Sequence, residues 1–157
     1  MYNWYFEDLE PGLRFETRGK TLSEPEILDF AFRYDPQPFH MDVAYAEAGP
    51  YGGLIASGIQ TIAVALRMFF QTPVFAPEIS IGSPGVDELR WLQPVRPGDT
   101  IRATGEILEV RASRSKPDRG IVRYRMEVLN QRDEVVMTML SAAIVRRQPA
   151  AAGGDPA

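Results

Sequence analysis

Two residues that can exchange protons lie five positions apart in the stretch YDPQPFHMD, residues 34–42. Asp35 supplies a carboxylate, and His40 is the only histidine of the chain. Pro36 and Pro38 prevent a helix from passing through this stretch, which predicts a stiff, irregular segment. If both side chains hold one water molecule at about 2.6–3.2 Å, they can act on it as a general acid and a general base. A stiff backbone limits the entropy that is lost when such a site is ordered.

A second chemical feature is the pair Ser57-Gly58 at the start of the apolar stretch SGIQTIAVALRMFF. Ser57 is a favourable N-cap, which places Gly58 in the first helical turn, where backbone N–H groups have no internal partner. Because glycine has no side chain, a carbonyl oxygen can approach this exposed turn, and the helix dipole favours negative charge there. Gly58 is therefore a candidate oxyanion donor. Gln37 is expected to orient the water or a substrate carbonyl.

Structural interpretations compete with these assignments. A lone histidine near an aspartate is more often structural than catalytic, and Ser57 is a helix cap more readily than a nucleophile. Asp35, His40 and Ser57 are the residue types of a serine-hydrolase triad, but the context IASGI lacks the Gly-x-Ser-x-Gly elbow of that class.

The whole-chain composition excludes several classes of function. A chain of 157 residues is predicted to form one domain over residues 1–148, followed by a disordered tail over residues 149–157. The net charge of -4 offers no basic face for nucleic acid, and no apolar stretch is long enough to span a membrane. No secretory signal is visible, so a cytoplasmic protein is expected. The absence of cysteine and the single histidine predict no metal site.

The hydrophobic pattern predicts helices first and strands afterwards. A strand is expected over residues 13–22, and the capping box SEPE then starts a helix with apolar positions Ile27, Leu28, Ala31 and Phe32. A short helix over residues 43–48 and an apolar, buried helix over residues 57–70 follow. Residues 121–129 alternate between apolar and polar side chains, which predicts a strand with one solvent-exposed face. Residues 135–145 are apolar on both faces. These elements predict an α+β hot-dog fold, in which a long antiparallel sheet wraps around a buried central helix.

The chain resembles the MaoC-like hot-dog dehydratases, which include the (R)-specific enoyl-CoA hydratases. The resemblance rests on YDPQPFHMD, GGLIASGIQT and WLQPVRPGDTI, and it extends from about residue 14 to residue 145. Its most specific element is the Asp-x-x-x-x-His spacing with Pro38 two residues before the histidine. Many hydratase members have His-Gly where this chain has Ser57-Gly58.

The resemblance implies an enoyl-CoA hydratase or 3-hydroxyacyl-CoA dehydratase in which Asp35 and His40 form the catalytic pair. It also implies an acyl-CoA thioester substrate, (R)-stereochemistry, no cofactor besides the coenzyme A of the substrate, and a homodimer or larger assembly. Substrate-binding roles are expected for Gln37, Pro38 and Ser57. The stretch RASRSKPDRG, residues 111–120, is expected to be a solvated hairpin, and its Arg114 and Lys116 are candidate contacts for coenzyme A phosphates.

Two other functions stay open at this point. A hot-dog thioesterase would hydrolyse the same kind of thioester, but many of these enzymes use a carboxylate on the central helix, and residues 57–70 contain no Asp or Glu. A non-catalytic acyl-CoA-binding subunit is the third candidate. The sequence does not decide which acyl chain is used, nor which of Asp35 and His40 is the base.

Overall fold

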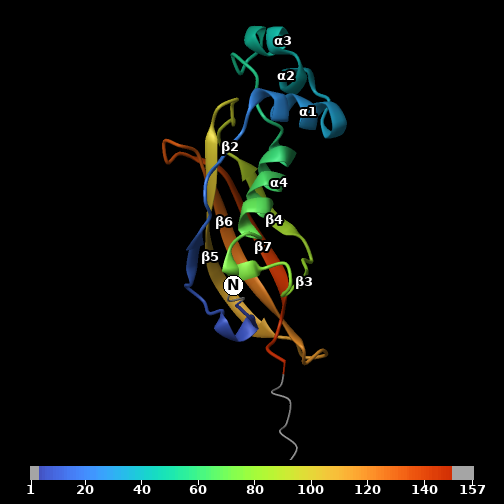
Figure 1. Cartoon of the computed structure of the whole chain (residues 1–157), viewed down its shortest axis with the longest axis vertical. Helices are drawn as coiled ribbons and strands as arrows, with labels where there is room; N and C mark the ends of the chain where they lie inside the picture. Colours follow the sequence, from blue (N-terminus) through green and yellow to red (C-terminus); the bar gives the residue numbers. More distant parts are fainter. Residues whose placement is uncertain (1–3, 150–157) are drawn as a thin grey trace, which may run out of the picture.

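The computed structural model describes residues 4–149, and the rest of the predicted tail lies outside the described residues. The chain forms one antiparallel sheet and four α-helices (Figure 1). The helices are α1 (Glu24–Tyr34), α2 (Pro38–Met41), α3 (Val43–Ala48) and α4 (Gly58–Phe69), with two 3-10 turns, η1 (Phe6–Asp8) and η2 (Pro73–Phe75). The strands are β1 (Arg14–Glu16), β2 (Lys20–Thr21), β3 (Ser80–Gly82), β4 (Val86–Trp91), β5 (Thr100–Ala112), β6 (Arg119–Leu129) and β7 (Val135–Arg146).

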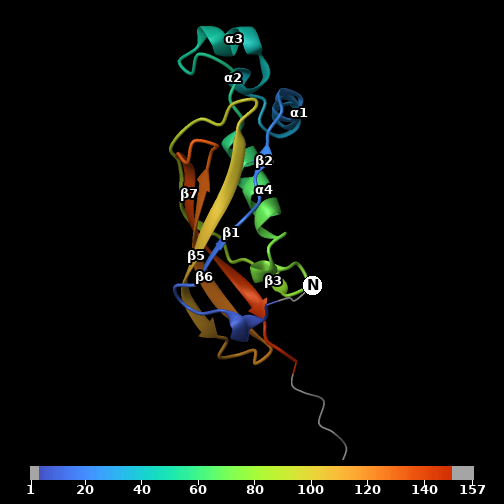
Figure 2. The ribbon, with the colours of Figure 1, turned by 60° about the vertical axis from the view of Figure 1, so that its left-hand side comes forward.

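The sheet has the order β1-β5-β6-β7-β3, with β2 also paired to β5 and β4 also paired to β7. The long strands β5, β6 and β7 form its centre, and α4 lies along one face (Figures 1 and 2). Helices α1, α2 and α3 gather at one end of the sheet, beyond the start of α4. This is the α+β hot-dog arrangement that the sequence predicts.

Most predicted elements are confirmed. Ser23 caps α1 through the expected reciprocal bonds with Glu26. Helix α3 has the predicted bounds, and β6 buries alternate side chains as its pattern indicates. The turns at residues 94–98 and 130–134 also lie between strands, as expected.

Three expectations need correction. The strand expected over residues 13–22 is divided into β1 and β2, because Thr17 bonds to Ala103 of β5 through both its backbone N–H and its hydroxyl oxygen. His40 lies on a short helix rather than on irregular chain, since Pro38 is tolerated at the first position of α2. Phe32 was expected on the apolar face of its helix but is 74% exposed.

Helix α4 is not buried all round within one chain. Its buried positions include the polar residues Gln60 and Thr61, whereas Ile59 is 52% exposed. On the sheet-facing side of α4, Phe69 of the helix packs against Phe75 and Tyr124, and the ring centroids of the three residues are 4.5–5.2 Å apart. These rings fill the space between helix and sheet, so the core specifies where α4 lies.

We expect Phe75→Ala to lower the free energy of unfolding by about 3–5 kcal/mol, the usual cost of removing a fully buried aromatic ring. Phe75 has no exposed surface and stacks on Phe69. Phe32→Ala is the matched control, because its ring is 74% exposed and its loss should change stability little. Equal effects of the two substitutions in denaturant unfolding would contradict this description of the core.

Candidate active site

Asp35 and His40 come together at one end of the sheet. Oδ2 of Asp35 lies 3.4 Å from Nε2 of His40, and the histidine side chain is only 5% exposed. Asp35 is the C-cap of α1 and His40 is in α2, so the turn at residues 35–37 brings the two groups to the same side. The five-residue spacing therefore does produce an acid–imidazole pair.

The imidazole is oriented by the backbone. Nδ1 of His40 lies 2.8 Å from the carbonyl oxygen of Ile55. A carbonyl oxygen can only accept a hydrogen bond, so Nδ1 carries a proton. In the neutral ring Nε2 is then an acceptor that faces the Asp35 carboxylate. Because two acceptors cannot bond to each other directly, the pair needs a shared proton or a molecule that donates to both.

Asp35 receives hydrogen bonds from two neighbours. The hydroxyl of Ser57 donates to Oδ2 at 2.6 Å, and the side-chain amide of Gln37 donates to Oδ1 at 2.8 Å. The Ser57 bond is the main reason that the pKa of Asp35 lies below its ordinary value. Partial burial opposes this shift, while Gln37 and the nearby His40 add to it. Asp35 is thus held as a carboxylate.

Ser57 has a structural position behind the pair. Its side chain is fully buried, and its oxygen accepts the N–H of Ile59 as the N-cap of α4 while its hydrogen goes to Asp35. The sequence analysis predicts a substrate-binding role for Ser57. In the structure, its side chain connects the start of α4 to the Asp35 carboxylate. Pro38 begins α2 and, like Ser57, is absent from the residues that line the adjacent pocket.

The pair faces a pocket of about 590 Å³. Four aromatic side chains, which the sequence analysis did not assign to the site, form much of its wall together with apolar residues of α4 and of the loop after β4. Tyr34 and Phe39 lie in YDPQPFHMD and Trp91 begins WLQPVRPGDTI, but nothing in the local sequence indicates that their rings face the pocket. Besides Asp35, His40, Gln37 and Gly58, the lining residues are Tyr34, Phe39, Tyr51, Ile55, Ala56, Ile59, Thr61, Trp91, Leu92, Gln93, Pro94 and Val95.

Gly58 lines this pocket, but its surroundings differ from the expectation of an exposed turn. A Cβ at this position would overlap with the indole ring of Trp91, whose Nε1, Cε2 and Cζ2 atoms all lie within 3.0 Å of it. The missing side chain thus makes room for Trp91. Within residues 4–149, the backbone N–H of Gly58 donates to no protein acceptor.

The two cationic candidates lie elsewhere. Arg114 and Lys116 belong to the β5–β6 turn, which lies at the end of the sheet opposite α1, α2 and α3 (Figures 1 and 2). Within one chain, the structure therefore does not bring them to the pocket that holds Asp35 and His40.

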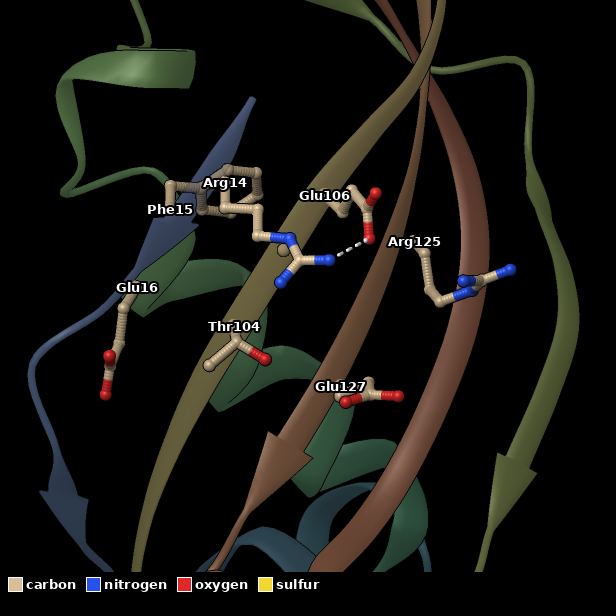
Figure 3. Close-up of a pocket in the computed structure, with 8 residues that line it drawn as sticks. Arg14, Phe15, Glu16, Thr104, Glu106, Arg125 and Glu127 are labelled. Carbon is tan, nitrogen blue, oxygen red and sulfur yellow. Dashed lines mark hydrogen bonds and ion pairs between the residues drawn. The ribbon is translucent and has the colours of Figure 1, made fainter. Parts of the chain in front are cut away.

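A second concavity, of about 610 Å³, lies on the face of the sheet that points away from α4 (Figure 3). Its charged residues alternate in sign across β1, β5 and β6, and Arg14 approaches Glu106 to 3.5 Å. It contains no imidazole and no helix terminus, so it lacks the proton-transfer groups of the first pocket. Its lining is Arg14, Phe15, Glu16, Thr104, Gly105, Glu106, Arg125 and Glu127.

Among the described residues, no three acidic, histidine or cysteine side chains are grouped so that they could hold a metal ion. None of the helices in the described part of the chain combines the length and the hydropathy of a membrane span.

Comparison with known proteins gives a consistent family. The family model described as "MaoC like domain" matches residues 8–130. The crystal structure of the MaoC-like dehydratase from Rhodospirillum rubrum superposes with a TM-score of 0.87 at 36% identity, covering 94% of this chain and all of that one. The Bacillus subtilis protein YdeM is 28% identical over 87% of this chain and 94% of its own length.

Another relative has a reaction in its name. The 3-hydroxybutyryl-CoA dehydratase of Methylorubrum extorquens is 32% identical over 108 residues, which are 68% of this chain and 65% of that enzyme. The chain therefore spans slightly less than two thirds of that dehydratase.

Ser57→Ala is expected to raise the pKa of Asp35, because it removes the hydrogen bond that lowers it most. A carboxyl group with a depressed native pKa stabilises the fold above its unfolded pKa of about 3.9, and that contribution is lost as the pH falls through the native pKa. The variant should therefore lose more stability at pH 7 than at pH 3, in addition to a pH-independent capping loss of about 1 kcal/mol.

Carbon-13 NMR titration of the Asp35 carboxyl, together with unfolding at both pH values, measures these effects. Ser83→Ala is the control, because Ser83 lies in an exposed turn and its hydroxyl bonds only to the backbone of Gly85. An unchanged Asp35 pKa in the Ser57 variant would show that the hydroxyl does not tune this carboxylate.

Proposed function

The chain belongs to the MaoC-like domain family, and from that premise we propose that it catalyses the reversible hydration of a 2-enoyl-CoA thioester to a 3-hydroxyacyl-CoA. The observation that carries the proposal is the Asp35–His40 pair, with Oδ2 and Nε2 3.4 Å apart at the wall of a pocket. The dehydratase from Methylorubrum extorquens supports the same reaction class by its name. No cofactor takes part in this reaction beyond the coenzyme A of the substrate.

The pair binds the reacting water. A water molecule has two hydrogens, and one goes to Nε2 of His40 and the other to the carboxylate of Asp35. This satisfies both acceptors, which cannot bond to each other while the ring is neutral. The two protein groups then act on a single water, held in place before the substrate reacts.

In the forward direction, the water oxygen forms a bond to the β-carbon of the enoyl group as one of its O–H bonds breaks. The proton passes to the pair, and the pair returns a proton to the α-carbon, so one water is added and nothing else is consumed. The electron pair of the double bond moves onto the thioester oxygen during the attack. The N–H of Gly58 donates to that oxygen, at the positive end of the α4 dipole.

The lowered pKa of Asp35 favours one division of labour. A carboxylate whose pKa is depressed is a weak proton acceptor, so Asp35 orients the water and stabilises an imidazolium. His40 then accepts the proton and later delivers it to the α-carbon. Gln37 and Ser57 act through Asp35, since both of them donate to its oxygens.

We expect Asp35→Asn and His40→Ala each to lower turnover by about 10²–10⁴, the usual effect of removing a positioned acid or base. The turnover of the double variant should be little lower than that of the less active single variant, because groups that handle one water act as a unit. Asparagine keeps the size of aspartate, so circular dichroism of this variant should match the wild type. Turnover is measured as loss of the enoyl-thioester absorbance of crotonyl-CoA.

A thiol reagent in the same assay separates the alternatives. Loss of absorbance without release of free thiol indicates a hydratase, and thiol release indicates a thioesterase. Neither signal, with binding retained, indicates an acyl-CoA-binding subunit. Single variants that keep more than about a tenth of the wild-type rate would rule out the pair, because such groups contribute at least 10²-fold.

We further propose that the protein is a homodimer. Strand β4 pairs only with β7, so within the described residues its other edge is open. Apolar side chains on α4, at its C-cap and around β4 are exposed in the single chain: Ile59 at 52%, Phe70 at 38%, Val86 at 45%, Trp91 at 51% and Leu92 at 52%. An exposed apolar surface next to an open strand edge is typical of an association site.

Sedimentation equilibrium at micromolar concentration should give twice the chain mass of 17.6 kDa. The double variant Val86→Lys/Phe70→Lys should shift the protein towards the monomer, because it places charge in the apolar surface. Tyr45→Lys on α3, where the tyrosine is 55% exposed, is the matched control and should leave the mass unchanged. A wild-type monomer would refute the association.

A further inference from the structure

Trp91 occupies the part of the pocket wall next to Gly58. It is the last residue of β4, and its backbone is placed opposite Met137 of β7. The N–H of the following residue, Leu92, donates to the carbonyl of Val136 at 2.8 Å, so the end of the strand is held in place. The indole edge that carries Nε1 is the edge that lies against Gly58. The ring is 51% exposed, so it is accessible from the pocket.

Some of the polar groups in this wall already have protein partners. Asp35 accepts from Ser57 and Gln37, and Nδ1 of His40 donates to Ile55. In contrast, within residues 4–149 the indole N–H of Trp91 has no protein acceptor, and neither does the backbone N–H of Gly58. Two unused donors from different elements, β4 and α4, therefore lie side by side in the pocket that holds the acid–imidazole pair.

We propose that Trp91 is a second substrate-contacting donor, whose indole N–H bonds to the thioester carbonyl oxygen beside the N–H of Gly58. This inference rests on the proposed function and adds to it a residue that recognises the acyl thioester. The oxygen has two lone pairs and gains negative charge as water attacks, so two donors stabilise it better than one.

The contact also explains why position 58 is a glycine. Any other residue would place its Cβ inside the indole ring and push Trp91 away from the start of α4. The glycine thus brings the indole donor close to the backbone donor.

The indole proton can be observed directly. The chain contains two tryptophans, Trp4 and Trp91, and therefore gives two indole signals in a proton–nitrogen correlation spectrum, which Trp91→Phe assigns. Saturating butyryl-CoA, which has the carbonyl but no double bond to hydrate, should move the Trp91 indole proton downfield. S-butyl-CoA has a methylene in place of the carbonyl, so it should perturb the amides of the pocket without this downfield shift.

Kinetics of Trp91→Phe provides the second readout. Phenylalanine keeps an aromatic wall but has no N–H, so kcat for crotonyl-CoA should fall about 10- to 100-fold, the range for losing one hydrogen bond to a charged oxygen. KM should change less, because the bond strengthens in the transition state. Trp4→Phe is the matched control, since Trp4 packs against the core and donates its backbone N–H to Pro73.

Three results would overturn the inference. The first is an equal downfield shift with both ligands, and the second is a Trp91→Phe variant that turns over like Trp4→Phe. The third is an indole proton that does not move while wild-type protein binds butyryl-CoA and hydrates crotonyl-CoA. In these cases the proposed hydratase function stands and Trp91 only packs against Gly58. Wild-type protein that neither binds nor hydrates these thioesters refutes the proposed function itself, and the role of Trp91 with it.

Discussion

The hydrogen bond between Ser57 and Asp35 is the interaction on which the site depends. Ser57 begins α4 and Asp35 ends α1, so this 2.6 Å bond joins two helix ends that are 22 residues apart in the sequence. The same hydroxyl oxygen caps α4 at Ile59. One fully buried side chain thus caps the central helix and makes the largest contribution to the lowered pKa of the carboxylate. Because α4 is itself fixed on the sheet by Phe69, the position of Asp35 is tied to the core.

The local elements could be read from the sequence because each has a local physical cause. The reciprocal bonds of Ser23 and Glu26 start α1, and the alternation from residue 121 to 129 matches the two faces of β6. The division of the strand expected over residues 13–22 has a non-local cause, which is the pairing of Thr17 with Ala103. No pattern within ten residues of Thr17 contains that information.

In the candidate site, too, only the features with a local cause could be predicted from the sequence. The spacing of Asp35 and His40 predicts an acid–imidazole pair because the proline-rich chain between them is short. The role of Ser57 as a partner of Asp35, rather than a wall of the pocket, depends on how α1 and α4 meet. Trp91 lies 33 residues after Gly58 in the sequence, yet its ring approaches Gly58 in the structure. Helix propensity therefore indicates only that a glycine is tolerated at position 58. In the structure, the volume of the Trp91 indole ring is the specific reason for a glycine at this position.

The exposed side of α4 connects the fold to the proposed assembly. An apolar pattern around most of a helix predicts burial on all sides, yet Ile59 is half exposed in one chain. Ile59 and Leu92 also line the pocket of Asp35 and His40, and the open edge of β4 leads to the same region through Trp91. A second copy that covers this surface would exclude water from the pocket as well as bury apolar area. Lower polarity strengthens the hydrogen bonds of Gly58 and Trp91 to a charged oxygen. Association and catalysis would therefore depend on the same residues, and a weakly associating variant should lose turnover upon dilution even with an intact Asp35–His40 pair.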